Sequence, residues 1–214
     1  MKTKITNLIF LMLIVAAFVV GIILYPRLPN VIASHWNAAG QVNGYMGKFW
    51  GVFLMPVILL VMFVLYLIIP RVDPLKANID SFRKHYNLFW VLFPVFLLYV
   101  YALQLGWNLG LRFNFSTAIV PVFALLWYFL GVIMSKAKRN WFFGIRTPWT
   151  LSNDIVWDKT HQLGGLLFKI AALISLLALF FSAKMFVYFI IIPILLIAAI
   201  TAIYSYLEFK KLKI

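Results

Sequence analysis

Six stretches of about 20 apolar residues run through this sequence, and they limit its possible folds more than any other feature. They lie at residues 5–24, 49–69, 88–106, 118–135, 164–182 and 186–207. A helix of this length spans the hydrocarbon core of a bilayer because it satisfies its backbone hydrogen bonds internally. The sequence therefore predicts an all-α integral membrane protein with six transmembrane helices, a multi-pass protein of the cell membrane.

The composition agrees with a membrane protein and excludes several kinds of site. The chain of 214 residues is 65% hydrophobic and 11% charged, whereas a soluble domain is about half apolar and about a quarter charged. The first apolar stretch, which follows Lys2 and Lys4, is too long for a secretory signal, so we expect a retained anchor. Since the chain has no cysteine, disulfides, thiolate metal sites and cysteine nucleophiles are excluded.

The distribution of Lys and Arg over the connections predicts the orientation. One side of the membrane receives 14 of these residues and the other side 4. The richer side holds Lys2, Lys4, Arg71, Lys76, Arg83, Lys84, Lys136, Lys138, Arg139, Arg146, Lys159, Lys210, Lys211 and Lys213. Because basic connections stay inside the cell, we expect both termini to be cytoplasmic, with an extracytoplasmic loop with turns at 25–48 and a structured cytoplasmic loop at 140–165.

The same charges indicate the general partners of the chain. The net charge of +14 is concentrated at the ends of the apolar stretches, where it meets lipid headgroups. We therefore expect membrane lipids as partners and no direct nucleic-acid binding. We interpret residues 1–214 as a single membrane domain, with a two-helix unit at 1–70 and a four-helix unit at 71–214. No cofactor or metal is expected, because the few acidic and histidine residues form no ligand cluster.

The outer loop reads LPNVIASHWNAAGQVNGYM over residues 28–46 and is rich in turn-forming residues. Asn43 and Gly44 form the Asn-Gly pair that favours a tight type I′ turn, and Gly40 allows another turn. A compact loop, with strands as one option, is expected. Its candidate binding residues are His35, Trp36, Asn37 and Gly40. Two interpretations remain open: a His-Trp pair packed at the membrane interface, or a site for an external ligand.

The cytoplasmic loop reads NWFFGIRTPWTLSNDIVWDKTHQLGG over residues 140–165. Pro148 excludes Thr147 from the helical region, and Ser152 is placed to cap a helix with Asp154 in its first turn. We expect this helix to begin near residue 153 and to continue into the fifth apolar stretch.

Several side chains of this helix share one face. Trp157, His161 and Gly164 are spaced for a common contact surface, and Asp158 is spaced to orient or charge the imidazole. Glycine at 164 and 165 allows close approach of another segment. The candidate binding residues of the loop are Asn140, Trp141, Gly144, Arg146, Thr147, Pro148, Trp149, Trp157, His161 and Gly164.

Three roles are open to the cytoplasmic loop. An interfacial belt would place its tryptophans at headgroup depth with Arg146 on a phosphate. A protein-contact or signalling surface would explain why glycine, arginine, proline and histidine gather there, which a belt explains less well. Catalysis is not expected, because Thr147, Thr150, Asp158 and His161 lack a nucleophile setting, so we predict a non-enzyme without catalytic residues.

The two loops together resemble a known family. The segment NWFFGIRTPWTLSNDIVWDKTHQLGG is similar to the cytoplasmic signature of the SdpI family, immunity proteins for the sporulation-delaying peptide toxin. The outer LPNVIASHWNAAGQVNGY resembles the uncharacterised domain found at the N-terminus of many members. The resemblance implies protection of the host membrane from a secreted peptide toxin. It also implies signalling, in which the occupied protein recruits a cytoplasmic transcriptional repressor. A small-solute or lipid transporter is the alternative that the residues leave open.

Overall fold

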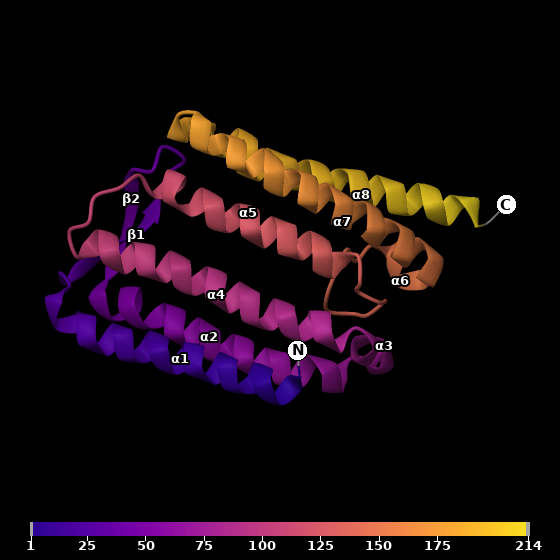
Figure 1. Ribbon diagram of the computed structural model, residues 1–214, viewed down its shortest axis with the longest axis horizontal. Helices are drawn as coiled ribbons and strands as arrows, with labels where there is room; N and C mark the ends of the chain where they lie inside the picture. Colours follow the sequence, from indigo (N-terminus) through magenta and orange to yellow (C-terminus); the bar gives the residue numbers. More distant parts are fainter. Residues whose placement is uncertain (1, 213–214) are drawn as a thin grey trace.

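The computed structural model describes residues 2–212, which contain six long helices (Figure 1). These helices are α1 (Thr3–Leu24), α2 (Lys48–Val72), α4 (Arg83–Asn108), α5 (Phe115–Met134), α7 (Asp154–Leu177) and α8 (Ile192–Lys211). Each is long and apolar enough to cross a membrane. The prediction of a six-helix, multi-pass protein of the cell membrane is therefore confirmed.

Shorter elements join the long helices at the two ends of the bundle. They include strands β1 (Val31–Trp36) and β2 (Val42–Gly47) and the short helices α3 (Lys76–Ser81) and α6 (Pro148–Ser152). We call the end with β1 and β2 the hairpin end, and the end with α6 the cap end. In Figure 1 the chain starts and finishes toward the cap end. Lys213, counted among the basic residues, lies outside the described residues.

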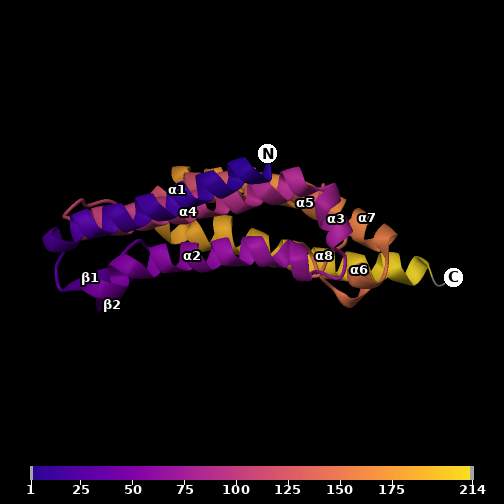
Figure 2. The same cartoon turned by 90° about the horizontal axis from the view of Figure 1, so that it is seen from below.

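The long helices form two groups. Helices α1, α2 and α4 pack together in one group, α5, α7 and α8 in the other, and α4 also contacts α5. Figure 2 shows that α1 and α4 lie over α2, so the first group has two layers. Its core contains Phe10, Leu59, Tyr66, Tyr86 and Trp90, all buried. The proposed division into units at residues 1–70 and 71–214 stays a prediction.

Helices α5 and α7 approach each other more closely than side chains normally allow. A Cβ added to Gly131 would lie 2.6 Å from the carbonyl oxygen of Gly165, and one added to Gly165 would lie 2.7 Å from the carbonyl oxygen of Gly131. Small residues permit such backbone contact between membrane helices. Gly165 therefore allows close approach as expected, and the residue that it approaches is Gly131.

The outer loop forms an antiparallel hairpin, but its turn is not where the sequence predicts it. The turn runs from Asn37 to Gln41, where the Asn37 N–H donates to the Gln41 carbonyl oxygen over 2.9 Å and Gly40 has a φ of +77°. Asn43 and Gly44 lie inside β2, so the expected type I′ turn at this pair is wrong.

A packing requirement explains the glycine at position 44. Gly44 faces His35 of β1 beside an irregularity in the register. A Cβ at this position would lie 2.8 Å from the Cβ of His35. Gly44 is therefore required for cross-strand packing. The turn is stabilised by the Asn37 side chain, which accepts from the N–H groups of Ala39 and Gln41 at 3.0 Å each.

Since the chain has no cysteine, single substitutions can test its membrane orientation. We expect Gln41→Cys, in the hairpin turn, to react with a membrane-impermeant maleimide in intact cells. Phe142→Cys, in the exposed part of the cap end, should react only after permeabilisation. Labelling of Phe142→Cys in intact cells together with protection of Gln41→Cys would reverse the predicted orientation.

Candidate functional site

The segment between α5 and α7, residues 136–152, folds into a compact structure that we call the cap. Asn140 organises its first part and is fully buried. Its Nδ2 donates to the carbonyl oxygens of Lys138 and Phe143, at 2.8 and 2.9 Å. Its Oδ1 accepts from the N–H groups of Phe142 and Phe143, at 3.0 and 2.6 Å. One amide side chain therefore satisfies four backbone groups of a tight turn.

His161 of α7 fixes the next part of the cap. The imidazole is 1% exposed, its Nδ1 lies 2.8 Å from the carbonyl oxygen of Trp157, and its Nε2 accepts from the Ile145 N–H over 2.9 Å. These partners define a neutral ring with its proton on Nδ1. Gly144 has a φ of +118° and lies directly against Nε2, where any Cβ would collide with the ring. The predicted common surface is thus a contact inside the protein.

Trp157 completes this contact between α7 and the cap. Its ring is fully buried and stacks on His161 with centroids 3.9 Å apart. Its Nε1 donates to the carbonyl oxygen of Ala137 over 2.8 Å. On the next turn of α7, a Cβ at Gly164 would lie 2.5 Å from Cδ1 of Ile145. Trp157, His161 and Gly164 therefore hold the cap against the start of α7, as their spacing predicts.

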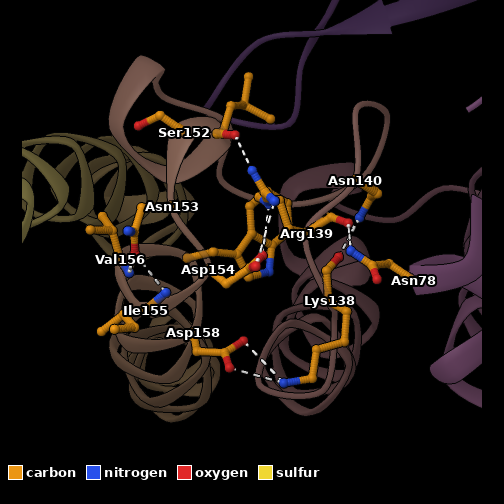
Figure 3. A network of polar contacts seen from close by, with 12 residues as sticks. Asn78, Lys138, Arg139, Asn140, Ser152, Asn153, Asp154, Ile155, Val156 and Asp158 are labelled. Atoms are coloured by element: carbon orange, nitrogen blue, oxygen red, sulfur yellow. Dashed lines mark hydrogen bonds and ion pairs between the residues drawn. The ribbon is translucent and has the colours of Figure 1, made fainter. Parts of the chain in front are cut away.

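The expected pairing of Asp158 with His161 does not form. Asp158 instead accepts from the Nζ of Lys138, 2.9 Å away, and so links α7 to the residues that follow α5 (Figure 3). Arg139 makes a second link: its Nε lies 2.7 Å from Oδ1 of Asp154, and its Nη1 donates to the Leu151 carbonyl oxygen. The imidazole is oriented by backbone groups, which a spacing argument on one helix does not reveal.

The start of α7 lies where the sequence places it, but its capping residue differs. Asn153 accepts from the N–H groups of Ile155 and Val156, at 2.8 and 3.2 Å, as Figure 3 shows. The prediction that Ser152 caps the helix is therefore wrong. Ser152 closes the preceding helix α6, where its hydroxyl donates to the Trp149 carbonyl oxygen. Asparagine is as good an N-cap as serine, so the sequence alone does not decide whether Ser152 or Asn153 caps α7.

Helix α6 is the last part of the cap, and it contacts α8. Thr147 is extended with a ψ of 163°, as Pro148 predicts, and it forms a capping box with Thr150. The Thr147 hydroxyl also lies 2.9 Å from the hydroxyl of Ser205 in α8. The ring centroid of Trp149 lies 5.1 Å from that of Tyr206 in the same helix. The cap therefore contacts both α7 and α8.

The remaining candidates lie on the outer surface of the cap. Trp141 is 49% exposed, and Arg146 and Pro148 are also exposed. Phe142, which was not among the predicted residues, is 44% exposed beside Trp141. The Nη1 of Arg146 donates to the Trp141 carbonyl oxygen over 2.5 Å. The candidate residues thus divide into an internal set that builds the cap and an external set that is free to contact a partner.

Asp73, just after α2, holds the cap from outside and is a residue that sequence reasoning missed. Its carboxylate is 2% exposed and accepts from the N–H groups of Trp141 and Leu75, at 2.9 and 2.6 Å. Asn78 of α3 donates to the Arg139 carbonyl oxygen nearby over 2.8 Å. A lone acidic residue at the end of a span was the available signal, but its partner lies 68 residues away in the sequence.

At the hairpin end, the outer candidates border a groove of about 300 Å³. It is lined by His35, Trp36, Asn37, Ala38, Phe115, Ser116, Ile119, Phe186, Val187 and Ile191. Trp36 stacks on Phe115 with centroids 4.0 Å apart, and the Asn37 carbonyl oxygen accepts from the Ser116 hydroxyl over 3.1 Å. The groove is mainly apolar with a polar rim, which suits an amphipathic ligand.

The other outer candidates shape the hairpin. The His35 Nδ1 lies 2.5 Å from Oδ1 of Asn43, so this imidazole contacts a side chain and not the loop backbone. Gly40 lies against Asn114, whose Nδ2 donates to the Ala39 carbonyl oxygen over 2.9 Å. Trp36 is therefore packed, and a groove lies open beside it, while a site for an external ligand stays a prediction.

These features define a class of protein. It is a six-helix membrane protein with a grooved hairpin at one end and, at the other, a cap held by side-chain hydrogen bonds. Residues 136–205 match the SdpI/YfhL protein family, and residues 12–60 match the domain of unknown function DUF1648. The resemblance seen in the sequence is confirmed, because the chain is similar to the SdpI family in this region. A Bacillus subtilis (strain 168) protein named Immunity protein SdpI is 26% identical over 212 residues, which cover 96% of this chain and 97% of that protein. No solved structure matches the chain.

Asn140 provides the test of how the cap is held together. We expect Asn140→Ala to destabilise the cap locally by about 2 kcal/mol, because buried backbone groups lose their partners. Trypsin should then cleave after Arg146 about 30-fold faster, since cleavage follows local opening. Trp141→Ala, which changes an exposed neighbour, is the control and should cleave at the wild-type rate. Equal rates for Asn140→Ala and the wild type would contradict the assigned role.

Proposed function

We propose that this protein protects its host membrane from a secreted peptide toxin. The observation that carries the proposal is the extent of the similarity to Immunity protein SdpI, which spans nearly the full length of both chains. The hairpin lies within the DUF1648 match, and the cap lies within the SdpI match. Both ends of the molecule are therefore included in the relationship.

The groove at the hairpin end is the proposed toxin site. A membrane-active peptide is amphipathic and approaches from the outer leaflet. Phe115, Phe186 and Val187 offer apolar contacts there, while His35 and Asn37 offer hydrogen-bonding groups at the rim. This placement requires the hairpin end to be extracytoplasmic, as the basic residues predict.

The exposed face of the cap is the proposed signalling surface. Trp141, Phe142 and Arg146 combine two large aromatic rings with a guanidinium, a composition typical of protein interfaces. A cytoplasmic transcriptional repressor is the proposed partner. Recruitment in response to toxin requires that the ligand favour one of two arrangements of the helices and the cap.

A non-enzymatic function is part of the proposal. In the closed cap, the Nε2 of His161 accepts from a backbone N–H and Nδ1 contacts a backbone carbonyl oxygen. The imidazole therefore has no free nitrogen to act as a general base.

The alternative of a small-solute or lipid transporter gains little support. A transporter needs polar groups that line a path near the middle of the membrane. The hydroxyls of Ser175, Thr201 and Ser205 donate to carbonyl oxygens of their own helices, and Gln104 donates to the Gly51 carbonyl oxygen. These groups serve helix packing.

Expression in a toxin-sensitive strain tests protection and the groove together. We expect the wild-type protein to restore survival, and Val187→Trp to reduce it to the empty-vector level, because the larger ring fills part of the groove. Tyr45→Ala, which changes an exposed residue of β2 outside the groove, should protect normally. Wild-type survival no better than with empty vector would remove the immunity proposal, and full protection by Val187→Trp would remove the groove from it.

Arg146 tests whether signalling is separable from protection. Arg146→Ala removes an exposed side chain from the cap surface while the internal contacts of Asn140 and His161 stay in place. We expect toxin-dependent recruitment of the repressor to the membrane to fall at least tenfold, with survival unchanged, because an interface arginine is worth more than 1.4 kcal/mol. Recruitment should be followed with a fluorescent repressor fusion. Normal recruitment by this variant would place signalling elsewhere.

A further inference from the structure

A polar cavity lies at the cap end of the first helix group, away from both sites described above. Its volume is about 160 Å³, and Thr3, Tyr66, Leu67, Pro70, Arg71 and Arg83 line it. Helices α1 and α4 begin here and α2 ends here, as Figure 1 shows. A water molecule occupies about 30 Å³ in the liquid, so the cavity has room for a phosphate-sized group.

Two guanidinium groups give this cavity its charge. Arg83 is held in place by an ion pair with Asp80, 2.5 Å away, and by the ring of Tyr86, 5.4 Å from its Cζ. Within residues 2–212, no ion pair is found for Arg71, which is exposed at the end of α2. Since Asp80 pairs with Arg83 and none of the described carboxylates pairs with Arg71, the guanidinium of Arg71 remains available to an anion.

The remaining lining residues add a hydrogen-bond donor and an apolar wall. The Oγ1 of Thr3 accepts from the Nδ2 of Asn87 over 3.3 Å, which leaves the hydroxyl proton of Thr3 for a ligand. The Tyr66 hydroxyl donates to Oδ1 of Asn87, so the phenol is already paired. Leu67, one turn deeper in α2 than Arg71, and Pro70, directly before Arg71, present apolar surface. An anionic head with an apolar continuation fits this arrangement.

We propose that this cavity binds the phosphate group of an anionic phospholipid. Arg71 and Arg83 would hold the phosphate oxygens, Thr3 would donate a further hydrogen bond, and the first part of the acyl region would lie along Leu67 and Pro70. A lipid is favoured over free phosphate because three membrane helices end at this level, which places the cavity at headgroup depth. Its ligand would join α1, α2 and α4 at the end where the chain enters the membrane.

Native mass spectrometry of the full protein, released from nanodiscs of mixed phosphatidylglycerol and phosphatidylcholine, tests this site. We expect the wild-type protein to retain one phosphatidylglycerol, and Arg71→Gln to bind it about tenfold more weakly, as loss of one charge-assisted hydrogen bond predicts. Lys76→Gln removes the same charge from the exposed start of α3 outside the cavity, and it should retain the lipid like the wild type. Arg71→Lys should recover only part of the affinity, because lysine lacks the guanidinium fork.

Three results would overturn the proposal. Equal loss of lipid by Arg71→Gln and Lys76→Gln would show attraction to net charge alone. Retention of phosphatidylcholine as strongly as phosphatidylglycerol would show that the cavity does not select an anionic phospholipid. Displacement of the retained lipid by millimolar inorganic phosphate would assign the cavity to free phosphate. If Arg71→Gln does not purify as a folded protein, Thr3→Val replaces it, with a smaller loss of lipid expected and unchanged retention counting against the site.

Discussion

The backbone contact between α5 and α7 at Gly131 and Gly165 determines the geometry on which the cap depends. Apolar burial does not drive helix association within the bilayer, so close contact between small residues is a main source of stability there. Each glycine faces the carbonyl oxygen of the other, and neither backbone can move aside for a methyl group. The separation of the two helices is thereby set close to its minimum, one turn of α7 away from His161.

The cap makes use of this fixed separation. The chain leaves α5 at Met134 and returns at Asp154, so the ends of both helices bound the cap. Trp157 reaches the Ala137 carbonyl oxygen just beyond α5, and His161 receives the Ile145 N–H. Irregular backbone near a membrane is stable only where its polar groups have partners. These partners come from α7, from the cap itself and from the Asp73 carboxylate after α2, so the cap also joins the two helix groups.

The parts of this structure that were predictable from sequence follow from local rules. Bilayer thickness sets the length of an apolar stretch, so the six helices were predictable, as was the start of α7 near Asn153. The spacing of Trp157, His161 and Gly164 also placed them on one face. The pairing of side chains with distant backbone groups was not predictable. The Asp158 carboxylate had two partners in reach, Lys138 and His161, and only the path of the cap decides between them. The Asn43-Gly44 pair has a strong turn signal, yet cross-strand packing against His35 uses the glycine differently.

The two ends of the molecule share helix α5, and this limits how they can communicate. Phe115 and Ser116 at the start of α5 border the groove, while the cap follows directly after its last residue. Because Gly131 cannot move closer to Gly165, α5 can respond to a ligand by sliding or rotating along α7, or by separating from it. Each of these motions would shift Ala137 relative to Trp157. A tenfold change in the population of an altered cap needs a ligand that prefers it by about 1.4 kcal/mol. The proposed toxin binding alone has no such requirement, so the proposed protection would persist in a variant whose cap does not take part in the proposed signalling.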